Sequence, residues 1–314
     1  MTTINQFVED NLGIKALHQL KNMQKGDKSN KKGHVYEKYF TIYKLVCLTL
    51  HIKQNFPKDN IKNILKNIRI SNSDYAYVDD LCIQYLTENK KLNYQLKNSS
   101  QTGKWNQDLQ QQFQNQAKLD LCYHKTTKTE QILVCSNEQL TEKNNKSISL
   151  LGDKYTFRSE FFPYLSKIDE IIMQNPLEFK TKLEKLCLTP GSNLSTALEK
   201  LNSILQKDED FNYDLCTIWE EAIAGLRPNI FSVFLDEPEG HFPDWFTDAC
   251  EHFSVKIKCT TTSYSLSAAG FDIHLNNHFF EKINKVDKKA FSGVIEFISF
   301  ILPLNSPDET NTTH

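Results

Sequence analysis

Two short apolar runs joined by a turn-like segment constrain the fold of this chain most. Residues 79–97 read DDLCIQYLTENKKLNYQLK. Apolar side chains occupy every second position in 81–85 and again in 92–96, a pattern typical of strands with one buried face. The pattern predicts an antiparallel hairpin.

The alternation also predicts how the two strands pair. With Thr87–Lys90 as the loop, the apolar residues of both runs face one side, because a slip of one residue would turn one set outward. This register places Asp80 opposite Lys97, with Gln95 on the same face. Directly opposed residues have Cβ atoms about 4.5–5.5 Å apart. We therefore expect Asp80, Gln95 and Lys97 to lie together at the open end of the hairpin.

These three side chains are suited to metal-assisted chemistry. A carboxylate and an amide oxygen are hard ligands of the kind that Mg²⁺ accepts. A lysine beside the metal can orient a water molecule or stabilise charge on a phosphate. Asp80 opposite Lys97 is equally an ordinary cross-strand ion pair, worth roughly 0.2–1 kcal/mol. The hairpin alone leaves both interpretations open.

The segments around the hairpin predict the rest of a domain. Residues 33–53 form an apolar run of helical length, and Glu37 is its single acid. A buried acid needs a partner, which is either a metal site or a Lys or Tyr side chain. After the hairpin, 105–120 shows helical spacing and 131–137 is short and β-branched, as in a buried strand. The expected order is helix, hairpin, helix, strand.

At this point the chain resembles the PD-(D/E)xK nuclease superfamily, which has the restriction-endonuclease-like fold. The closer resemblance is to the CD-NTase-associated endonuclease family, the effector nucleases of anti-phage defence. It covers roughly residues 25–140. Gln95 stands where the family more usually has Glu. The matching motifs are Gly33-x-x-Tyr36-Glu37, Asp79-Asp80-Leu81 and Tyr94-Gln95-Leu96-Lys97.

The resemblance implies a fold, a reaction and partners. It implies an α/β restriction-endonuclease-like domain over 1–140 that cleaves double-stranded DNA with little sequence specificity. Asp80, Gln95 and Glu37 would hold Mg²⁺, for which Mn²⁺ can substitute, with help from the Leu96 carbonyl. Lys97 would position the attacking water. The protein would serve a multi-subunit defence complex beside a protein partner, with a homo-oligomer as a further option.

Two other functions remain open at this stage. Because Gln95 replaces the usual Glu, the chain could be a non-catalytic DNA-binding or scaffold subunit of the same fold. It could also be a protein–protein adaptor in which Asp80 and Lys97 form a structural ion pair. Metal affinity at Asp80 separates the first alternative from the nuclease, and DNA binding at low salt separates the second.

The charge of the 314-residue chain is unevenly distributed. Residues 1–150 hold 22 Lys and Arg against 14 Asp and Glu, a net charge of +8, whereas 151–314 hold 15 against 25, a net charge of −10. A basic half attracts phosphate. Only three arginines occur in the whole chain, which favours backbone contact by lysines over base reading or else reflects compositional bias.

The second half carries no catalytic signature. Polar residues 136–149 suggest a domain boundary, so we expect a mostly helical α+β domain over 150–314 that regulates the first or docks a partner. Helices are expected over 161–172, 177–186, 194–205, 215–226 and 245–253 and near the C-terminus, with strands over 229–237 and 254–262.

Several classes of protein are excluded by what the sequence lacks. The strand ending in Asp236-Glu237 resembles part of an ATPase, but no phosphate-binding GxxxxGK[ST] loop accompanies it. The eight cysteines show no CxxC or CxxH spacing, which argues against structural zinc. With no apolar run of membrane-spanning length and no signal peptide, we expect a cytoplasmic protein that does not associate with membranes.

Overall fold

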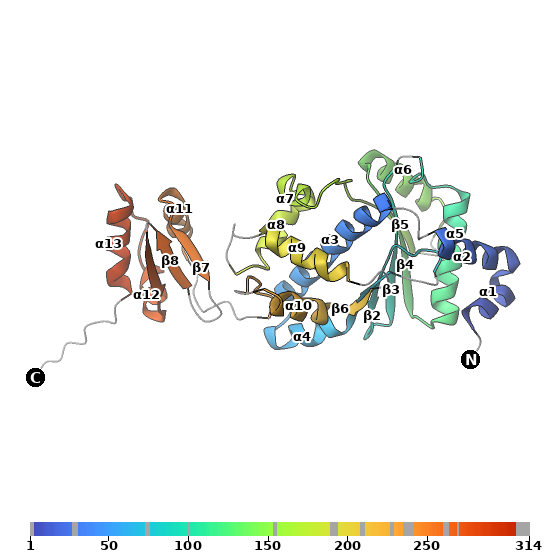
Figure 1. Cartoon of the computed structure of the whole chain (residues 1–314), viewed down its shortest axis with the longest axis horizontal. Helices are drawn as coiled ribbons and strands as arrows, with labels where there is room; N and C mark the ends of the chain where they lie inside the picture. Colours follow the sequence, from blue (N-terminus) through green and yellow to red (C-terminus); the bar gives the residue numbers. More distant parts are fainter. Residues whose placement is uncertain are drawn as a thin grey trace, which may run out of the picture. The chain divides into compact units, whose positions relative to one another are not determined.

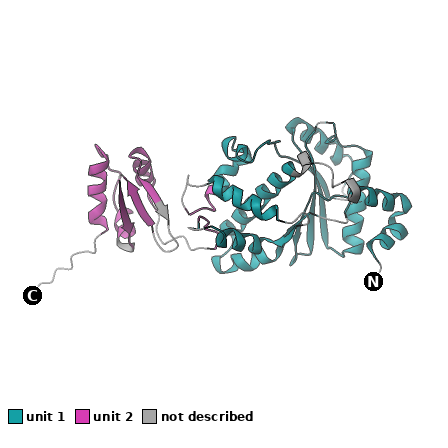
Figure 2. Ribbon diagram, viewed as in Figure 1, with its two compact units in different colours: residues 1–183, 193–229 teal, residues 184–192, 230–314 magenta. Residues whose placement is uncertain are grey.

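The computed structural model describes residues 3–26, 31–72, 76–99, 101–152, 156–188, 194–207, 211–226, 229–234, 242–259, 264–268 and 270–305. The chain divides into two compact units, shown in Figure 2. Unit 1 comprises residues 1–183 and 193–229, and unit 2 comprises residues 184–192 and 230–314. Each unit is described by itself below.

Unit 1 is built on a six-stranded mixed sheet with the order β5-β4-β3-β2-β1-β6. Neighbouring strands are parallel from β3 through β4 to β5 and antiparallel from β3 to β6. The α/β class predicted from sequence is therefore confirmed. The strands are β1 (Ile68–Ser71), β2 (Leu81–Tyr85), β3 (Lys90–Lys97), β4 (Lys128–Cys135), β5 (Thr156–Phe161) and β6 (Asn212–Asp214).

Helices cover both faces of this sheet (Figure 1). On one face α3 packs Phe40 against Tyr94 of β3, with ring centroids 5.3 Å apart. On the other, Phe113 of α5 joins Leu133 and Cys135 of β4 in an apolar cluster. The helices are α1 (Ile4–Leu12), α2 (Ile14–Gly26), α3 (Lys31–Asn55), α4 (Lys58–Lys66), α5 (Gln107–Lys118), the π-helical turn η2 (Leu119–Tyr123), α6 (Glu138–Ser149), α7 (Glu170–Met173), the 3₁₀ turn η3 (Pro176–Glu178), α8 (Phe179–Glu184), α9 (Leu194–Leu205) and α10 (Leu215–Ala224).

The elements predicted around the hairpin occur in the predicted order, but helix α4 and strand β1, which were not predicted, lie between the long helix and the hairpin. The long helix is α3, the hairpin is β2 and β3, the next helix is α5, and the strand after it is β4. Tyr36 and Phe40 of α3 are buried, as the apolar character of this helix predicts. The hairpin lies in the middle of the sheet, so its two strands are held by neighbours on both sides.

The pairing register of the hairpin differs from the predicted one by two residues. Leu81 pairs with Tyr94, and Tyr85 pairs with Lys90, which leaves Leu86–Asn89 as the loop. Asn89 adopts a left-handed conformation with φ 48°, which Asn tolerates better than most residues. A shift of two residues keeps every side chain on its predicted face, because the side-chain period of a strand is two.

The second half of the sequence contributes more to unit 1 than expected. The helix predicted over 161–172 is wrong: Thr156–Phe161 is strand β5, which pairs in parallel with β4, and only Glu170–Met173 is helical. The boundary placed between the predicted domains 1–140 and 150–314 falls at helix α6, which packs on β5. The observed division lies further along the chain, because β5, β6, α9 and α10 complete the layers of unit 1.

Unit 2 has a three-stranded antiparallel sheet, order β7-β8-β9, and an aromatic core. The predicted helices 245–253 and near the C-terminus are confirmed. Of the strand predicted over 254–262, Lys256–Cys259 is strand β7, and residues 260–262 lie outside the described residues. Of the strand predicted over 229–237, Phe231 forms an isolated bridge with Cys187, and residues 235–237 lie outside the described residues. The elements are α11 (Asp244–His252), β7 (Lys256–Cys259), β8 (Tyr264–Ala268), β9 (Phe271–Leu275), α12 (Asn277–Ile283) and α13 (Val294–Leu304).

Candidate active site

The carboxylate of Asp80 lies beside β3, one residue before β2 begins. Its Oδ2 accepts hydrogen bonds from Gln95 Nε2 at 2.6 Å and from the backbone N–H of Leu96 at 2.5 Å. Asp80 is half-buried, and Gln95 is only 2% exposed. The structure therefore brings together Asp80 and Gln95, as the sequence predicts, but with Asp80 level with Gln95 and not with Lys97.

The Gln95 amide uses its nitrogen in a hydrogen bond to Asp80, and the state of its oxygen differs. Its Oε1 is buried and has no hydrogen-bond partner among the described residues, which is unfavourable for a buried carbonyl. A glutamine can present either its NH₂ or its oxygen to a neighbour. Turning the amide over would set Oε1 against the Asp80 carboxylate, and two oxygens repel unless a cation lies between them.

The donor set at this point fits a hard divalent cation. Asp80 offers a carboxylate and Gln95 offers a buried amide oxygen, which are ligands of the type that Mg²⁺ prefers, and Mg²⁺ keeps several waters besides. Within the described ranges no group of three or more His, Cys, Asp or Glu side chains is placed to hold a metal ion. The set predicted from sequence, Asp80, Gln95 and Glu37, contains only two acids and one amide, so it is not a group of this kind.

Lys97 is the last residue of β3 and lies on the same face as Gln95. The two Cα atoms are two residues apart on one strand, about 7 Å. Lys97 is half-buried and pairs in parallel register with Cys135 of β4. In the observed register Asp80 is level with Gln95, so Lys97 lies two residues further along β3, at the carboxyl end of the parallel strands.

Glu37 lies on α3 near the end of the sheet at which strand β5 ends. The hydroxyl of its neighbour Tyr36 donates to the carbonyl of Phe162 at 2.6 Å, directly after β5. Further along α3, Lys44 lies over the ring of Tyr94 at 4.9 Å. Glu37 is seven residues before Lys44, about 10 Å along a helix, and Lys97 is about 10 Å beyond Tyr94 along β3. Glu37 lies on α3, which packs on the face of the sheet that carries Tyr94, whereas Gln95 and Lys97 of the same strand project from the opposite face, toward α5. The structure therefore does not place Glu37 on the face that carries Gln95 and Lys97.

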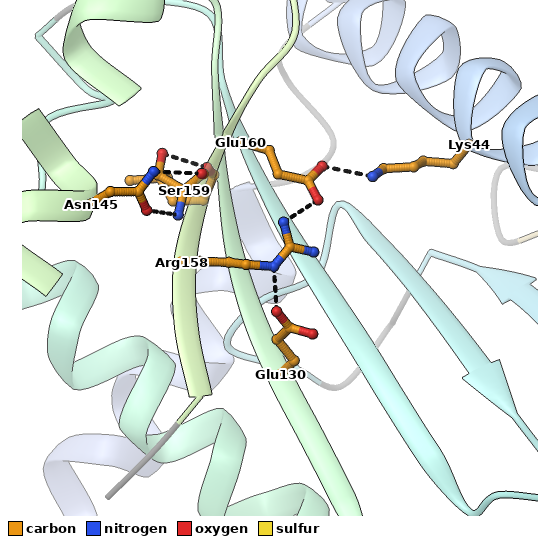
Figure 3. Close-up of polar contacts among 7 residues, drawn as sticks. Lys44, Glu130, Asn145, Arg158, Ser159 and Glu160 are labelled. Atoms are coloured by element: carbon orange, nitrogen blue, oxygen red, sulfur yellow. Dashed lines mark hydrogen bonds and ion pairs between the residues drawn. The ribbon is translucent and has the colours of Figure 1, made fainter. Parts of the chain in front are cut away.

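A chain of charges that the sequence did not indicate crosses the α3 face of the sheet (Figure 3). Lys44 donates to Glu160 at 2.6 Å, and Arg158 bonds to both Glu160 and Glu130. Burial alone would raise the pKa of Glu160, but the charges of Lys44 and Arg158 outweigh it and hold that pKa below its usual value. This chain of charges ties α3, which carries Glu37, to β4 and β5.

A second polar network, on the α5 face, centres on the fully buried Asp120. Its Oδ2 accepts from Asn93 at 2.7 Å and from Thr129 at 2.6 Å, and its Oδ1 lies 3.6 Å from the ammonium of Lys91. Asp120 belongs to η2, which follows α5. Sequence reasoning missed this carboxylate, although polar residues at inward positions of the strands, such as Asn93 and Gln131, are a signal that could have found it.

The edge strand β5 is secured by Asn145 of α6. The Asn145 side chain accepts from Ser159 N–H at 2.7 Å and donates to Ser159 C=O at 2.9 Å, as Figure 3 shows. These bonds replace a strand pairing at one position of an otherwise open edge. The parallel strands whose carboxyl ends flank Lys97 are held in place on this side.

Comparisons with protein-family models, with curated proteins and with solved structures gave no match. In the part of the chain that the structure describes, no helix has both the length and the apolar character needed to cross a membrane.

Proposed function

We propose that this protein is a metal-dependent endonuclease that hydrolyses double-stranded DNA, with the restriction-endonuclease-like fold in unit 1. The observation that carries the proposal is the convergence of Asp80, Gln95 and the backbone of Leu96. The buried Gln95 oxygen there has no hydrogen-bond partner in the part of the chain that the structure describes. Support also comes from the element order, which is that expected of the resemblance.

Each residue has a defined part in the proposed reaction. Asp80 and Gln95 would hold a Mg²⁺ ion, for which Mn²⁺ can substitute. Glu37, the further ligand that the resemblance implies, lies on the opposite face of the sheet from Gln95 and is not part of this pair. The Lys97 ammonium orients the attacking water and stabilises negative charge on the phosphate. The metal, when bound, lowers the pKa of a water and neutralises developing charge.

The substrate class follows from charge. The positive half of the chain includes the whole candidate site, and lysine-rich surfaces bind the nucleic acid backbone without reading sequence. Unregulated DNA cleavage is toxic to a cell, so we propose that the protein acts as the effector subunit of an anti-phage defence complex in the cytoplasm, with a protein partner and optionally as a homo-oligomer.

The test is cleavage of supercoiled and linear plasmid with Mg²⁺ or Mn²⁺. Asp80→Ala and Lys97→Ala should each reduce metal-dependent cleavage by about 100-fold or more, because each removes a group that acts in the transition state. Lys90→Ala is the matched control, since Lys90 lies on the same strand and packs over the Tyr85 ring. Its cleavage should equal that of the wild type.

Equal cutting by all variants would place the activity elsewhere and contradict the assignment. If the wild type cuts nothing, the assay is repeated with the products of neighbouring genes, because the effector of a complex can require its partner. Absence of cleavage under both conditions would reject the nuclease.

A non-catalytic DNA-binding or scaffold subunit is the second candidate, and one observation favours it. The Gln95 amide satisfies Asp80 with a hydrogen bond that needs no metal. Gln95→Glu separates the two: it restores the family's usual acid, so a nuclease should bind Mg²⁺ more tightly and cut at least as fast. In a scaffold subunit the variant should only lose stability, because a buried acid at position 95 then faces the half-buried Asp80.

A further inference from the structure

We propose that Gln116 and Asp120 are positioning residues for Asp80, and that they act through the backbone of Tyr77. The inference rests on the proposed function, because it concerns the metal affinity of Asp80. Neither residue belongs to the set that the sequence indicates for the site, and both lie on the α5 side of the sheet.

A directed chain of hydrogen bonds links the three residues. Gln116 Nε2 donates to Asp120 Oδ1 at 3.0 Å, and Gln116 Oε1 accepts from the backbone N–H of Tyr77 at 2.8 Å. Gln116 is 2% exposed and Asp120 is fully buried. Because a carboxylate only accepts and a backbone N–H only donates, just one orientation of the amide satisfies both neighbours.

One end of this chain is fixed to the sheet. Asp120 Oδ2 accepts from Asn93 of β3 and Thr129 of β4, so the carboxylate cannot shift without breaking bonds to two central strands. The backbone carbonyl of Asp120 also accepts from Thr126 N–H at 3.0 Å. Asp120 therefore accepts the hydrogen bond of the Gln116 amide from a position that the sheet fixes.

The other end holds a segment that has no regular structure of its own. Residues 76–80 belong to neither a helix nor a strand, and they lead into β2 at Leu81. Tyr77 is fully buried, its N–H is held by Gln116, and its hydroxyl donates to the carbonyl of Ala16 at 3.0 Å. Asp80 follows three residues later, so the position of Tyr77 limits where the Asp80 carboxylate can lie.

A purely structural role would give a different result from a positioning role. Any loss from a buried polar network lowers stability. Only a positioning role makes metal binding depend on the link to Tyr77 more than on other bonds to Asp120. Residues that orient a metal ligand typically contribute about 10–100-fold in metal affinity.

The experiment uses the full chain and measures Mn²⁺ binding by titration, with amide hydrogen exchange of the peptide covering Tyr77 in metal-free protein. Gln116→Met removes the link at similar length. Thr129→Val is the matched control, because it removes one donor to Asp120 and leaves the Tyr77 bond in place. Asp80→Asn reports whether Mn²⁺ binds at the proposed site.

We expect Gln116→Met to weaken Mn²⁺ binding by about tenfold and to speed exchange at Tyr77, whereas Thr129→Val changes affinity by less than about twofold. Equal affinities in the two variants, whatever their stability, would overturn the positioning role while Asp80→Asn still abolished binding. Mn²⁺ binding that is absent in the wild type, or unchanged in Asp80→Asn, would instead reject the metal site itself.

Discussion

The two units bury different kinds of side chain. Among the described residues, every buried polar side chain except that of Ser232 lies in unit 1, and several, such as Asn93, Gln95 and Gln131, lie on its central strands. The core of unit 2 is dominated by aromatic rings, with Phe246 in contact with Phe242, Trp245, Phe279 and Phe297.

This difference indicates where function resides. Buried polar groups cost free energy unless they are bonded, and apolar groups of the same shape often stabilise a fold as well or better. A core that needs only stability therefore resembles that of unit 2. Two of the polar groups of unit 1, Asn93 and Gln131, lie on the same face of the central strands as Gln95, which is the arrangement expected where position and charge matter more than stability.

The largest effect is expected in the aromatic core. Phe246→Ala should lower the free energy of unfolding of unit 2 by about 3–5 kcal/mol, because it removes a fully buried ring and leaves a cavity. Hydrogen exchange of peptides from the two units measures this, and Phe246→Leu is a milder control. If peptides of unit 1 lost protection equally, the two cores would unfold together, and they could not be treated as separate in stability.

A smaller loss is expected when the polar network of unit 1 is altered without changing its volume. Asp120→Asn replaces an acceptor by a donor that faces the donors of Asn93 and Thr129, and it removes the charge opposite Lys91. We expect a loss of about 2–3 kcal/mol in the stability of unit 1. Chemical denaturation measures it, with the exposed Glu142→Gln as control. An unchanged midpoint would mean that the network does not stabilise the fold.

The sequence determines the faces of the hairpin but not its register. Alternation in β2 and β3 has a period of two, so it assigns each residue to a face and cannot distinguish pairings that differ by two. The loop makes that choice, and Asn89 in a left-handed conformation closes it one residue earlier than predicted. The pairing of Asp80 with Gln95 follows from this turn.

Long-range polar contacts were the features least accessible to sequence reasoning. Strand β5 carries Arg158 and Glu160 on one face, and both side chains pair with Lys44 and Glu130, which are distant in sequence. The sequence of this segment, TFRSEF, does not show the apolar alternation by which a strand is predicted. Asp120 was missed for the same reason, since its partners come from three separate elements.

The smallest effect concerns the charges of the α3 face and depends on pH. The pKa of Glu160 is lower in the folded chain than in the unfolded one, where it is about 4.3. Its contribution to stability is therefore fully present above pH 4.3 and is lost as pH falls through the lower folded pKa. Glu160→Gln should reduce stability by about 1 kcal/mol at pH 7 and flatten the loss of stability below pH 4.3. Urea midpoints between pH 2.5 and 7 measure this, with the exposed Glu178→Gln as control. An unaltered slope would mean that other carboxylates carry the acid sensitivity of unit 1, and the α3 face would then resemble an ordinary surface more than a fixed support for Glu37.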